Sequence, residues 1–231
     1  MKILALETST EYCSVALWQD GSVISRSELV GQKHSEWLMP MLGLLLKEVG
    51  VTLAQCDGVA LGSGPGSFTG VRIACGVTQG LAFGAELPVA CICTLLALAE
   101  GSGQPRVIAA LDARMGEIYF AAYQRTEEGW LAVCEPCLCK PEAAPLVSGT
   151  GWFGAGSGFA AYGEALQARY AGMMRGVDAA AVPQAAAIAV LGAAQFAQGL
   201  GVDAARALPL YLRDKVALKT VEREQLAASH A

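Results

Sequence analysis

Residues 4–18 read LALETSTEYCSVALW, and residues 109–123 read AALDARMGEIYFAAY. The two stretches align without a gap, and in each an apolar run ends at an acidic residue, turns and returns as a second apolar run. Glu7 and Asp112 are the acidic residues at equivalent places. Because a short apolar run with a polar stop is typical of a buried strand, the repeat predicts a duplicated α/β fold with two lobes and a cleft between them.

The sequence that surrounds the first stretch predicts the other elements of one lobe. Short apolar runs predict strands at 2–8, 13–18, 23–28, 57–61 and 89–93. Apolar side chains at three- and four-residue spacing predict helices at 35–49 and 69–83, and a third helix that begins at 95. Asp20-Gly21 is a hairpin signal between the second and third strands. We therefore expect each lobe to be built on a β-β-β-α unit.

The turn-rich sequence GSGQP at 101–105 predicts a hinge between the lobes. We expect an N-terminal lobe at 1–102, a C-terminal lobe at 103–213 and a polar tail at 214–231. In the second lobe the pattern predicts a strand–loop region at 147–159, helices at 162–170 and 184–198, and an extended segment at 209–214.

The composition excludes several classes of protein. The 231 residues are 54% hydrophobic and only 16% charged, which is the opposite of the balance in disordered chains. No window offers about 18 consecutive apolar residues, so a membrane-spanning helix is not expected. The N-terminus turns polar after six residues, too early for the apolar part of a signal peptide. We therefore expect a cytoplasmic protein.

The charge balance bears on the kind of partner. The formal net charge is −5, from 16 basic and 21 acidic residues, and there is no basic run. A surface that binds nucleic acid unaided usually concentrates Lys and Arg. The basic residues near the C-terminus alternate with acidic ones, as on a solvated helix face. We therefore expect any contact with nucleic acid to depend on a partner.

The cysteines and histidines do not form a recognisable metal or catalytic site. Eight cysteines without a signal peptide indicate reduced thiols. Cys134, Cys137 and Cys139 are the one cluster, but no second pair completes a zinc site. The two histidines, His34 and His230, lie far apart in sequence and neither belongs to a recognisable catalytic triad. The sequence therefore predicts no metal site.

Two turns are candidate phosphate sites, and the first is ETST at 7–10, which puts an acid and three hydroxyls after the first strand. GSGPGSFTGVR, at 62–72, stands between a strand and a helix, where free backbone N–H groups could bind an anion. The alternative is a tight turn that lets the helix pack closely on the sheet, and the sequence leaves both open. The candidate residues, including those of the two acidic turns, are Glu7, Thr8, Ser9, Gly64, Gly66, Ser67 and Asp112.

The second acidic turn is poorly suited to phosphate. Asp112-Ala113-Arg114-Met115 brings two long side chains and no hydroxyl, which argues against an efficient phosphotransferase. GAGSG, at 154–158, could contact an adenine or simply turn the chain, and the sequence favours the turn.

The predicted helix at 69–83 and the residue after it contain a stripe of glycines. Gly76, Gly80 and Gly84 recur every four residues, although each costs about 1 kcal/mol against alanine in a helix. The stripe indicates that another helix approaches closely. That helix could be 35–49 of the same lobe or belong to another chain, and the sequence slightly favours the internal partner.

Four stretches together resemble one protein family, the TsaB (YeaZ) family, over residues 1 to about 215. They are LALETSTEYCSVAL, GSGPGSFTGVR, LDARMGEIYFAAY and PLYLRD, in this order and spacing. The resemblance implies the two-lobed actin-like, sugar-kinase-like ATPase fold. It also implies the family's role, which is formation of threonylcarbamoyladenosine (t6A) at position 37 of bacterial tRNAs that read codons beginning with adenine.

The resemblance further implies a pseudo-enzyme. The related catalytic subunit TsaD uses a metal held by two histidines four residues apart. Thr94 and Leu98 fall near those positions in this chain, and neither is such a ligand. The resemblance therefore implies a non-catalytic activator of TsaD with no cofactor of its own, although a nucleotide at the interface of the complex is left open.

Partners are implied in the same way. The helices at 35–49 and 69–83 would pack against a TsaD-like subunit, a TsaE-like ATPase would join the heterodimer, and tRNA would bind through the complex. Alone, the same face would form a homodimer. The residues expected at this interface are Leu38, Met39, Leu42, Leu45, Leu46, Val71, Gly76 and Gly80.

Two other functions remain as alternatives. A weak ATPase is favoured by the turns ETST and GPGSFTG and opposed by the crowded turn at Asp112. A peptidase lacks any recognisable pair of nucleophile and base.

Overall fold

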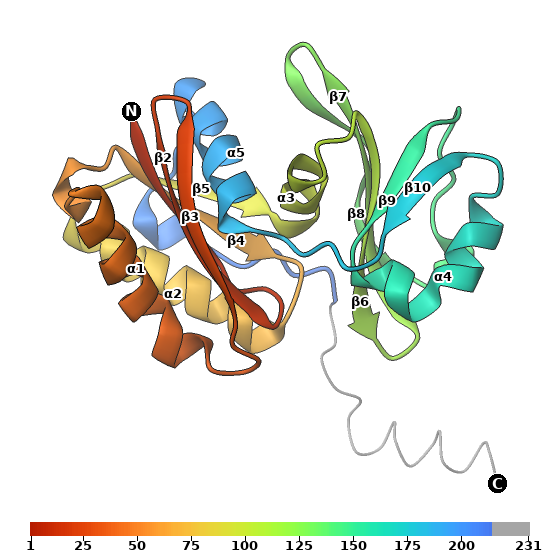
Figure 1. Cartoon of the computed structure of the whole chain (residues 1–231), viewed down its shortest axis with the longest axis horizontal. Coiled ribbons are helices and arrows are strands. Elements are labelled where there is room, and N and C mark those ends of the chain that lie inside the picture. The colour runs from red at the N-terminus through yellow and green to blue at the C-terminus, as the bar shows by residue number, and fades with distance from the viewer. Residues whose placement is uncertain (214–231) are drawn as a thin grey trace, which may run out of the picture.

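The computed structural model describes residues 1–213, which form two α/β lobes side by side (Figure 1). The predicted tail at 214–231 and the last residue of PLYLRD lie outside the described residues. Each lobe contains one five-stranded mixed sheet. The predicted two-lobed α/β fold is therefore confirmed.

The first sheet has the strand order β3-β2-β1-β4-β5. Its strands are β1 (Lys2–Glu7), β2 (Tyr12–Gln19), β3 (Ser22–Leu29), β4 (Gly58–Gly64) and β5 (Val89–Cys93). β1, β2 and β3 form an antiparallel meander, while β1, β4 and β5 run parallel. All five strands lie where the apolar runs predict them, within a few residues.

The second sheet repeats this arrangement, with the order β10-β9-β6-β7-β8. Its strands are β6 (Arg106–Arg114), β7 (Glu117–Thr126), β8 (Gly129–Cys139), β9 (Trp152–Ala155) and β10 (Met174–Asp178). β6 pairs with β7 and β9 just as β1 pairs with β2 and β4. The alignment of Glu7 with Asp112 is thereby confirmed, since both residues lie near the ends of equivalent strands.

The helices of the first lobe are α1 (His34–Val49), α2 (Phe68–Gly84) and α3 (Thr94–Gly101). The helices of the second half of the chain are α4 (Ser157–Arg169) and α5 (Ala185–Ala197). Short 3₁₀ turns lie at Leu53–Gln55, Pro141–Ala143 and Ala204–Arg206. No helix within residues 1–213 is both long and apolar enough to cross a membrane.

The second lobe lacks one predicted helix. Between β8 and β9, where the first lobe has α1, the described chain forms only the 3₁₀ turn Pro141–Ala143. Pro141, Pro145, Gly149 and Gly151 interrupt this stretch, and proline and glycine both oppose a helix. The expected β-β-β-α unit is therefore complete only in the first lobe.

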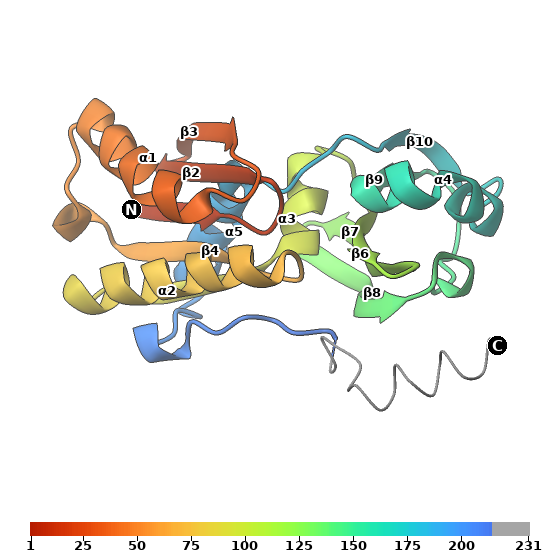
Figure 2. The same cartoon turned by 90° about the horizontal axis from the view of Figure 1, so that it is seen from below.

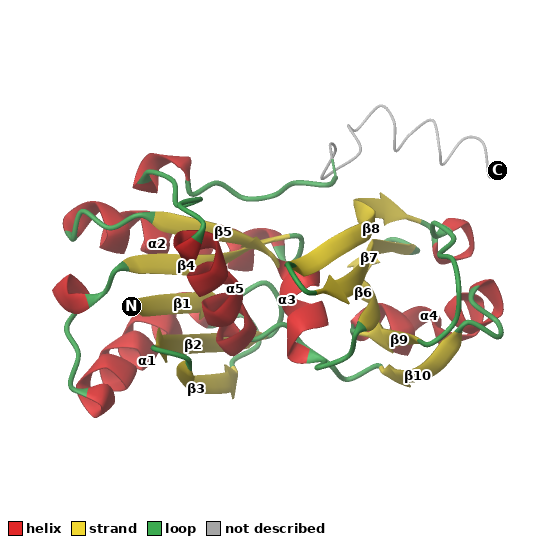
Figure 3. Ribbon diagram, turned by 90° about the horizontal axis from the view of Figure 1, so that it is seen from above, coloured by secondary structure: helices red, strands yellow, loops and turns green. Residues whose placement is uncertain are grey.

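The lobes exchange their last helices. α3 follows β5 of the first sheet and packs on both sides: Leu95 and Leu98 pack with Val107 and Ala109 of the second sheet, whereas Ala97 joins the cluster on the first sheet. In the other direction, α5 follows β10 and packs on the first sheet, where Ile188 joins the cluster that includes Ile3 and Ala60. Figure 3 shows α5 lying across the first sheet and α3 between the two sheets.

This exchange corrects two predictions. Packing with the second sheet begins in α3, before the predicted hinge at 101–105. α5 and the 3₁₀ turn at Ala204–Arg206 belong to the first lobe, although the range 103–213 assigns them to the second. An amphipathic pattern shows that a helix has a buried face, but not which sheet covers it.

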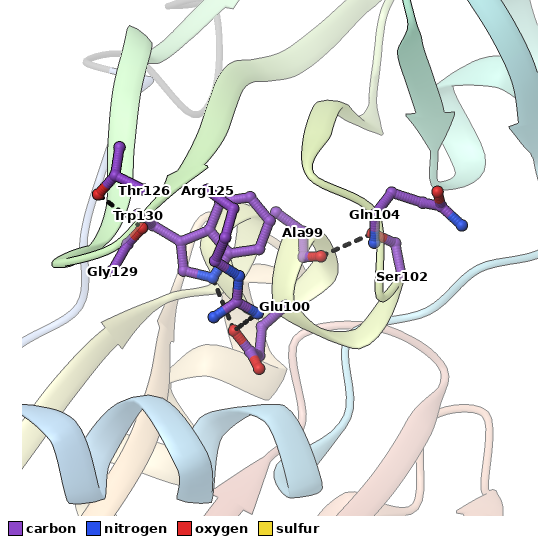
Figure 4. A network of polar contacts seen from close by, with 8 residues as sticks. All are labelled: Ala99, Glu100, Ser102, Gln104, Arg125, Thr126, Gly129 and Trp130. Carbon is purple, nitrogen blue, oxygen red and sulfur yellow. Dashed lines mark hydrogen bonds and ion pairs between the residues drawn. The ribbon is translucent and has the colours of Figure 1, made fainter.

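A polar network fixes α3 to the β7–β8 hairpin (Figure 4). Glu100 accepts hydrogen bonds from the Arg125 guanidinium at 2.7 Å and from the Trp130 indole N–H at 2.6 Å. The Arg125 guanidinium also lies 4.4 Å from the centroid of the Trp130 ring. Since Glu100 belongs to α3, these contacts attach the exchanged helix to the second lobe.

Candidate functional site

The turns after β1 and β6 meet at a cleft between the lobes. The cleft has a volume of about 920 Å³, and its lining comes from both lobes and from the C-terminal segment 210–213. Ser9, Gly66, Ser67 and Asp112 line it, as the duplicated turns predict. Glu7, Thr8 and Gly64 are buried behind the lining.

In the first turn, polar groups are occupied by contacts within the chain. The Ser9 N–H donates to the Glu7 carboxylate at 2.5 Å, and the Thr8 hydroxyl donates to the Gly70 carbonyl at 2.8 Å. The Ser67 N–H donates to the Ser9 carbonyl at 2.7 Å, while the Ser67 hydroxyl caps α2 by accepting from the Gly70 N–H at 3.3 Å. Several groups that could bind phosphate are therefore already used.

The glycines of GSGPGSFTG allow α2 to approach this turn closely. A Cβ at Gly70 would lie 1.9 Å from the Thr8 carbonyl oxygen, and one at Gly66 would lie 2.6 Å from the Ser9 carbonyl oxygen. At Gly62 a Cβ would meet the Glu7 carboxyl at 1.8 Å. Of the two interpretations that the sequence leaves open, this geometry favours the tight turn. Phosphate binding here stays a prediction.

Glu7 is a buried acid with one unpartnered oxygen. Its side chain is 1% exposed, and Oε2 has no hydrogen-bond partner among the described residues. Burial raises the pKa of the Glu7 carboxyl above its ordinary value of 4.5, against the opposing effect of the hydrogen bonds from Ser9. The acid of the first turn is therefore built into the interior rather than presented to a ligand.

Replacing Glu7 with glutamine should change how stability depends on pH. An acid with a raised pKa in the folded state stabilises the fold fully at low pH, and this contribution is lost as pH rises above the unfolded-state value. From pH 4.5 upward, the wild-type free energy of unfolding should fall relative to Glu7→Gln, by at most about 1.4 kcal/mol per pH unit. Denaturant titrations of both proteins at several pH values measure the difference, and a constant difference would contradict the raised pKa.

In the second turn, Asp112 is held by its neighbours. Its carboxylate forms an ion pair with Arg114 at 3.1 Å and accepts from the Arg114 N–H at 2.8 Å and the Tyr162 hydroxyl at 3.2 Å. Arg114 and Met115 both project from the turn, and they are largely exposed. That these side chains exclude phosphate from the turn stays a prediction.

The loop GAGSG before α4, like the loop before α2, contains glycines whose neighbours leave no room for a Cβ. A Cβ at Gly156 would lie 2.4 Å from the Ala110 carbonyl oxygen, and one at Gly158 would lie 2.8 Å from the Ala110 Cβ. These contacts favour the turn, as the sequence does, because glycine is needed there for close packing.

Thr94 and Leu98, which the resemblance places near a metal-ligand pair, are both buried. The Thr94 hydroxyl accepts from the Gly64 N–H at 3.1 Å, and Leu98 packs in the core of the second lobe. Among the residues that the structure describes, no group of three or more His, Cys, Asp or Glu side chains could hold a metal ion. His34 is buried, with Nε2 3.2 Å from the Tyr12 carbonyl oxygen.

The three clustered cysteines lie on β8, at the edge of the second sheet. All are free thiols. Burial, together with the neighbouring Cys137, raises the pKa of the Cys139 thiol to about 12. A thiol with so high a pKa is a poor nucleophile, so the cluster offers no reactive cysteine at Cys139.

The helix face predicted as a partner interface needs correction residue by residue. Leu38, Leu42, Leu45 and Val71 are buried in the core of the first lobe, where they pack with strands of the first sheet. Leu46 is partly buried against the same core. The four buried residues cannot present their side chains to a partner, because the most regular apolar stripe of α1 is the one that faces its own sheet.

Other residues of α1 and α2 do face outward. Both helices cover the same side of the first sheet, and Figure 2 shows them side by side. Six exposed residues of these two helices are apolar or glycine and define what we call the α1–α2 face, which leaves out Gly43, Phe68 and Gly84: they are Trp37, Met39, Leu44, Gly76, Gly80 and Phe83. Of these, Met39, Gly76 and Gly80 belong to the predicted set. Trp37, Leu44 and Phe83 were missed because they interrupt the regular leucine spacing.

The glycine stripe has no helix against it within the described chain. A Cβ at Gly76, Gly80 or Gly84 would meet no atom within 4 Å. The slight preference for an internal partner helix is therefore wrong, and the stripe is open to another chain. Phe83, in the same helix, is 82% exposed.

Comparisons with known proteins give a match to the TsaD family model and full-length relatives named TsaB. Residues 23–220 match the family model described as "TsaD: tRNA N6-adenosine threonylcarbamoyltransferase". The chain is 41% identical to the Escherichia coli tRNA threonylcarbamoyladenosine biosynthesis protein TsaB, over 95% of this chain and 97% of that protein. It is 36% identical to the Haemophilus influenzae protein of the same name, over 95% and 96%. The solved structure of YeaZ from Pseudomonas aeruginosa is similar with a TM-score of 0.85 and 41% identity, covering 91% of this chain and 99% of that one.

Proposed function

Since this chain belongs to the TsaB family, we propose that it is required for forming t6A at position 37 of tRNAs that read codons beginning with adenine. In this proposal it acts in the cytoplasm as a non-catalytic activator of a TsaD-like threonylcarbamoyltransferase. The observation that carries the non-catalytic part is the first turn, where the Thr8 hydroxyl and the N–H groups of Ser9 and Ser67 form hydrogen bonds within the chain.

The contact with the catalytic subunit is proposed for the α1–α2 face. Gly76 and Gly80 leave the surface of α2 flat, so a partner helix can approach its backbone closely. Trp37, Leu44 and Phe83 add exposed apolar area, and aromatic residues are enriched in the buried centres of interfaces. A monomer gains nothing from exposing these side chains, whereas an interface would bury them.

The remaining partners belong to the same proposal. A TsaE-like ATPase would join the heterodimer, and tRNA would bind through the complex, since the net charge of −5 does not favour strong unaided binding. Without the catalytic subunit, two copies of this chain would pair through the α1–α2 face. A nucleotide, if one binds, would lie at the interface of the complex.

Reconstitution tests the proposal. The purified chain alone should form no t6A on an unmodified tRNA transcript supplied with the threonylcarbamoyl adenylate. Adding the TsaD-like and TsaE-like subunits should give modification, and omitting this chain from that mixture should lower the yield at least about tenfold. Nucleoside analysis by mass spectrometry measures the product. Modification by the isolated chain would sink the non-catalytic role.

A weak ATPase is the second candidate, because two turns that resemble phosphate turns face one cleft. If the chain hydrolyses ATP unaided, Thr8→Ala should abolish the turnover, since Thr8 belongs to the first of these turns. We expect no turnover above background in the wild-type protein. A peptidase is disfavoured because neither the sequence nor the described site pairs a nucleophile with a base.

A further inference from the structure

A segment near the C-terminus runs from the first lobe to the second beside the cleft. Residues 207–213, which we call the strap, contain no helix or strand. Ala204, in the 3₁₀ turn just before the strap, is buried in the core of the first lobe, whereas residues 210–213 line the cleft between the lobes. Figure 2 shows the strap running along α2 toward the second lobe. The strap is therefore a covalent connection between the lobes.

Contacts with α2 and β4 attach the strap to the first lobe. The Leu210 N–H donates to the Ser63 carbonyl at 2.7 Å. The Arg72 guanidinium donates to the Tyr211 hydroxyl at 2.7 Å, and the Phe68 and Tyr211 ring centroids lie 6.4 Å apart. The strap therefore moves with the first lobe as far as Tyr211.

Arg213, at the end of the strap, contacts the β6–β7 hairpin of the second lobe. Its guanidinium donates to the Ala113 carbonyl at 3.0 Å and forms an ion pair with Glu117 at 2.8 Å. The Arg213 side chain is 16% exposed and that of Glu117 is 31% exposed, so solvent screens this pair less than a pair on the open surface. Arg213 thus ties the strap to the second lobe.

Within residues 1–213, two other connections join the lobes. α3 packs on both sheets, and residues 179–184 lead from β10 to α5, which packs on the first sheet. Figures 2 and 3 show the strap and residues 179–184 on opposite sides of α3. Two-lobed proteins open and close by rotation about a few residues at such connections. A third connection on the other side of α3 opposes that rotation.

The strap is too short to follow a large rotation while both of its ends stay attached. Only Tyr211 and Leu212 separate Leu210, which is bound to the first lobe, from Arg213, which is bound to the second. Each residue adds at most about 3.6 Å to the reach of a chain. Rotation of the lobes would therefore pull Arg213 away from its partners.

We propose that the strap is an interlobe restraint and that Arg213 is its releasable contact. While Arg213 holds Ala113 and Glu117, the lobes keep one relative orientation and the cleft keeps one width. When this contact is broken, the lobes rotate about α3 and residues 179–184. The restraint is a property of the isolated chain and needs no partner.

An interlobe distance measured by double electron–electron resonance tests the restraint. Ser25 in β3 and Gln167 in α4 are exposed and lie outside the cleft. Spin labels attached there through p-acetylphenylalanine leave the eight cysteines unmodified, and dilution with unlabelled chain limits the signal to distances within one molecule. We expect one narrow distance distribution in the otherwise unchanged chain. Arg213→Ala should broaden it at least about twofold or add a second distance.

Arg206→Ala is the matched control. It removes the same type of side chain from the 3₁₀ turn before the strap, where Arg206 is exposed and outside the cleft, and it should leave the distribution unchanged. Glu117→Gln keeps Arg213 but removes the charge of its partner, so it should broaden the distribution by less than Arg213→Ala does.

Thermal unfolding shows whether each variant is folded. An unchanged distribution in folded Arg213→Ala, or equal broadening by Arg206→Ala, would overturn the restraint. If Arg213→Ala does not fold, Glu117→Gln decides, and an unchanged distribution in that variant would overturn the restraint as well. Since the measurement uses this chain alone, either result leaves the proposed function standing.

Discussion

Gly80→Arg should abolish the association of this chain with the TsaD-like subunit while leaving the isolated chain folded. A Cβ at Gly80 meets no atom within 4 Å, so the new side chain has room in the free protein. Arginine is also a better helix former than glycine, by somewhat less than about 1 kcal/mol. Stability of the isolated chain should therefore stay the same or rise slightly.

In the complex the same change should be severe. A long charged side chain would hold apart two helices that the glycine stripe allows to approach closely, and its charge would lose water without gaining a partner. An unpaired charge in a buried place is destabilising by about 3–5 kcal/mol, so affinity should fall at least about a hundredfold. Formation of t6A in the reconstituted system should fall with it.

The measurements are binding titrations with the catalytic subunit and thermal unfolding of the free chain. Gly163→Arg is the matched control, because Gly163 lies in α4 of the second lobe and a Cβ there also meets no atom within 4 Å. Gly163→Arg should bind normally. If Gly80→Arg binds the catalytic subunit as tightly as the wild type, the α1–α2 face is not the interface.

Much of the fold could be predicted from local patterns. The repeat of strand, acid and strand places Glu7 and Asp112 at equivalent turns, and the sheets have the same connectivity around both. Helix spacing placed α1, α2 and α5 within about two residues of their observed bounds. These features depend on side chains close in sequence, which a single sequence shows directly.

Arrangements that depend on distant residues could not be predicted. The sequence of α3 or α5 does not show which sheet the helix packs on, because either sheet could bury the same apolar stripe. The hydrogen bond between Arg72 and Tyr211 could not be predicted for the same reason. Tyr211 and Arg72 are far apart in sequence, and only the folded chain brings the ring and the guanidinium together.

The residues of the candidate interface were also hard to predict from the sequence alone. Leu38, Leu42 and Leu45 form the clearest stripe on α1, and a clear stripe is first of all evidence for the chain's own core. A partner surface is instead made of residues that break the pattern, such as Trp37 and Phe83. The glycines are informative only with the structure, because Gly70 and Gly76 look alike in sequence but differ in their surroundings.

The different surroundings of Gly70 and Gly76 predict a second large effect, on the free energy of unfolding. Gly70→Ala should lower the free energy of unfolding by about 3 kcal/mol, the upper part of the range for forcing extra volume into a packed site. A Cβ at Gly70 would lie 1.9 Å from the Thr8 carbonyl oxygen. Neither backbone can yield easily, since the Gly70 carbonyl accepts from the Thr8 hydroxyl at 2.8 Å.

Gly76→Ala, two turns further along α2, is the matched control and should have the opposite sign. A Cβ at Gly76 meets nothing within 4 Å, so alanine should raise the free energy of unfolding by about 0.5–1 kcal/mol through helix propensity alone. Denaturant unfolding of the two variants and the wild type gives both values. Equal effects of the two substitutions would mean that helix propensity governs Gly70 as well, and that α2 does not pack tightly on the first turn. In that case the structure would no longer favour a tight turn over a phosphate site at 62–72. The ATPase alternative would then be favoured again.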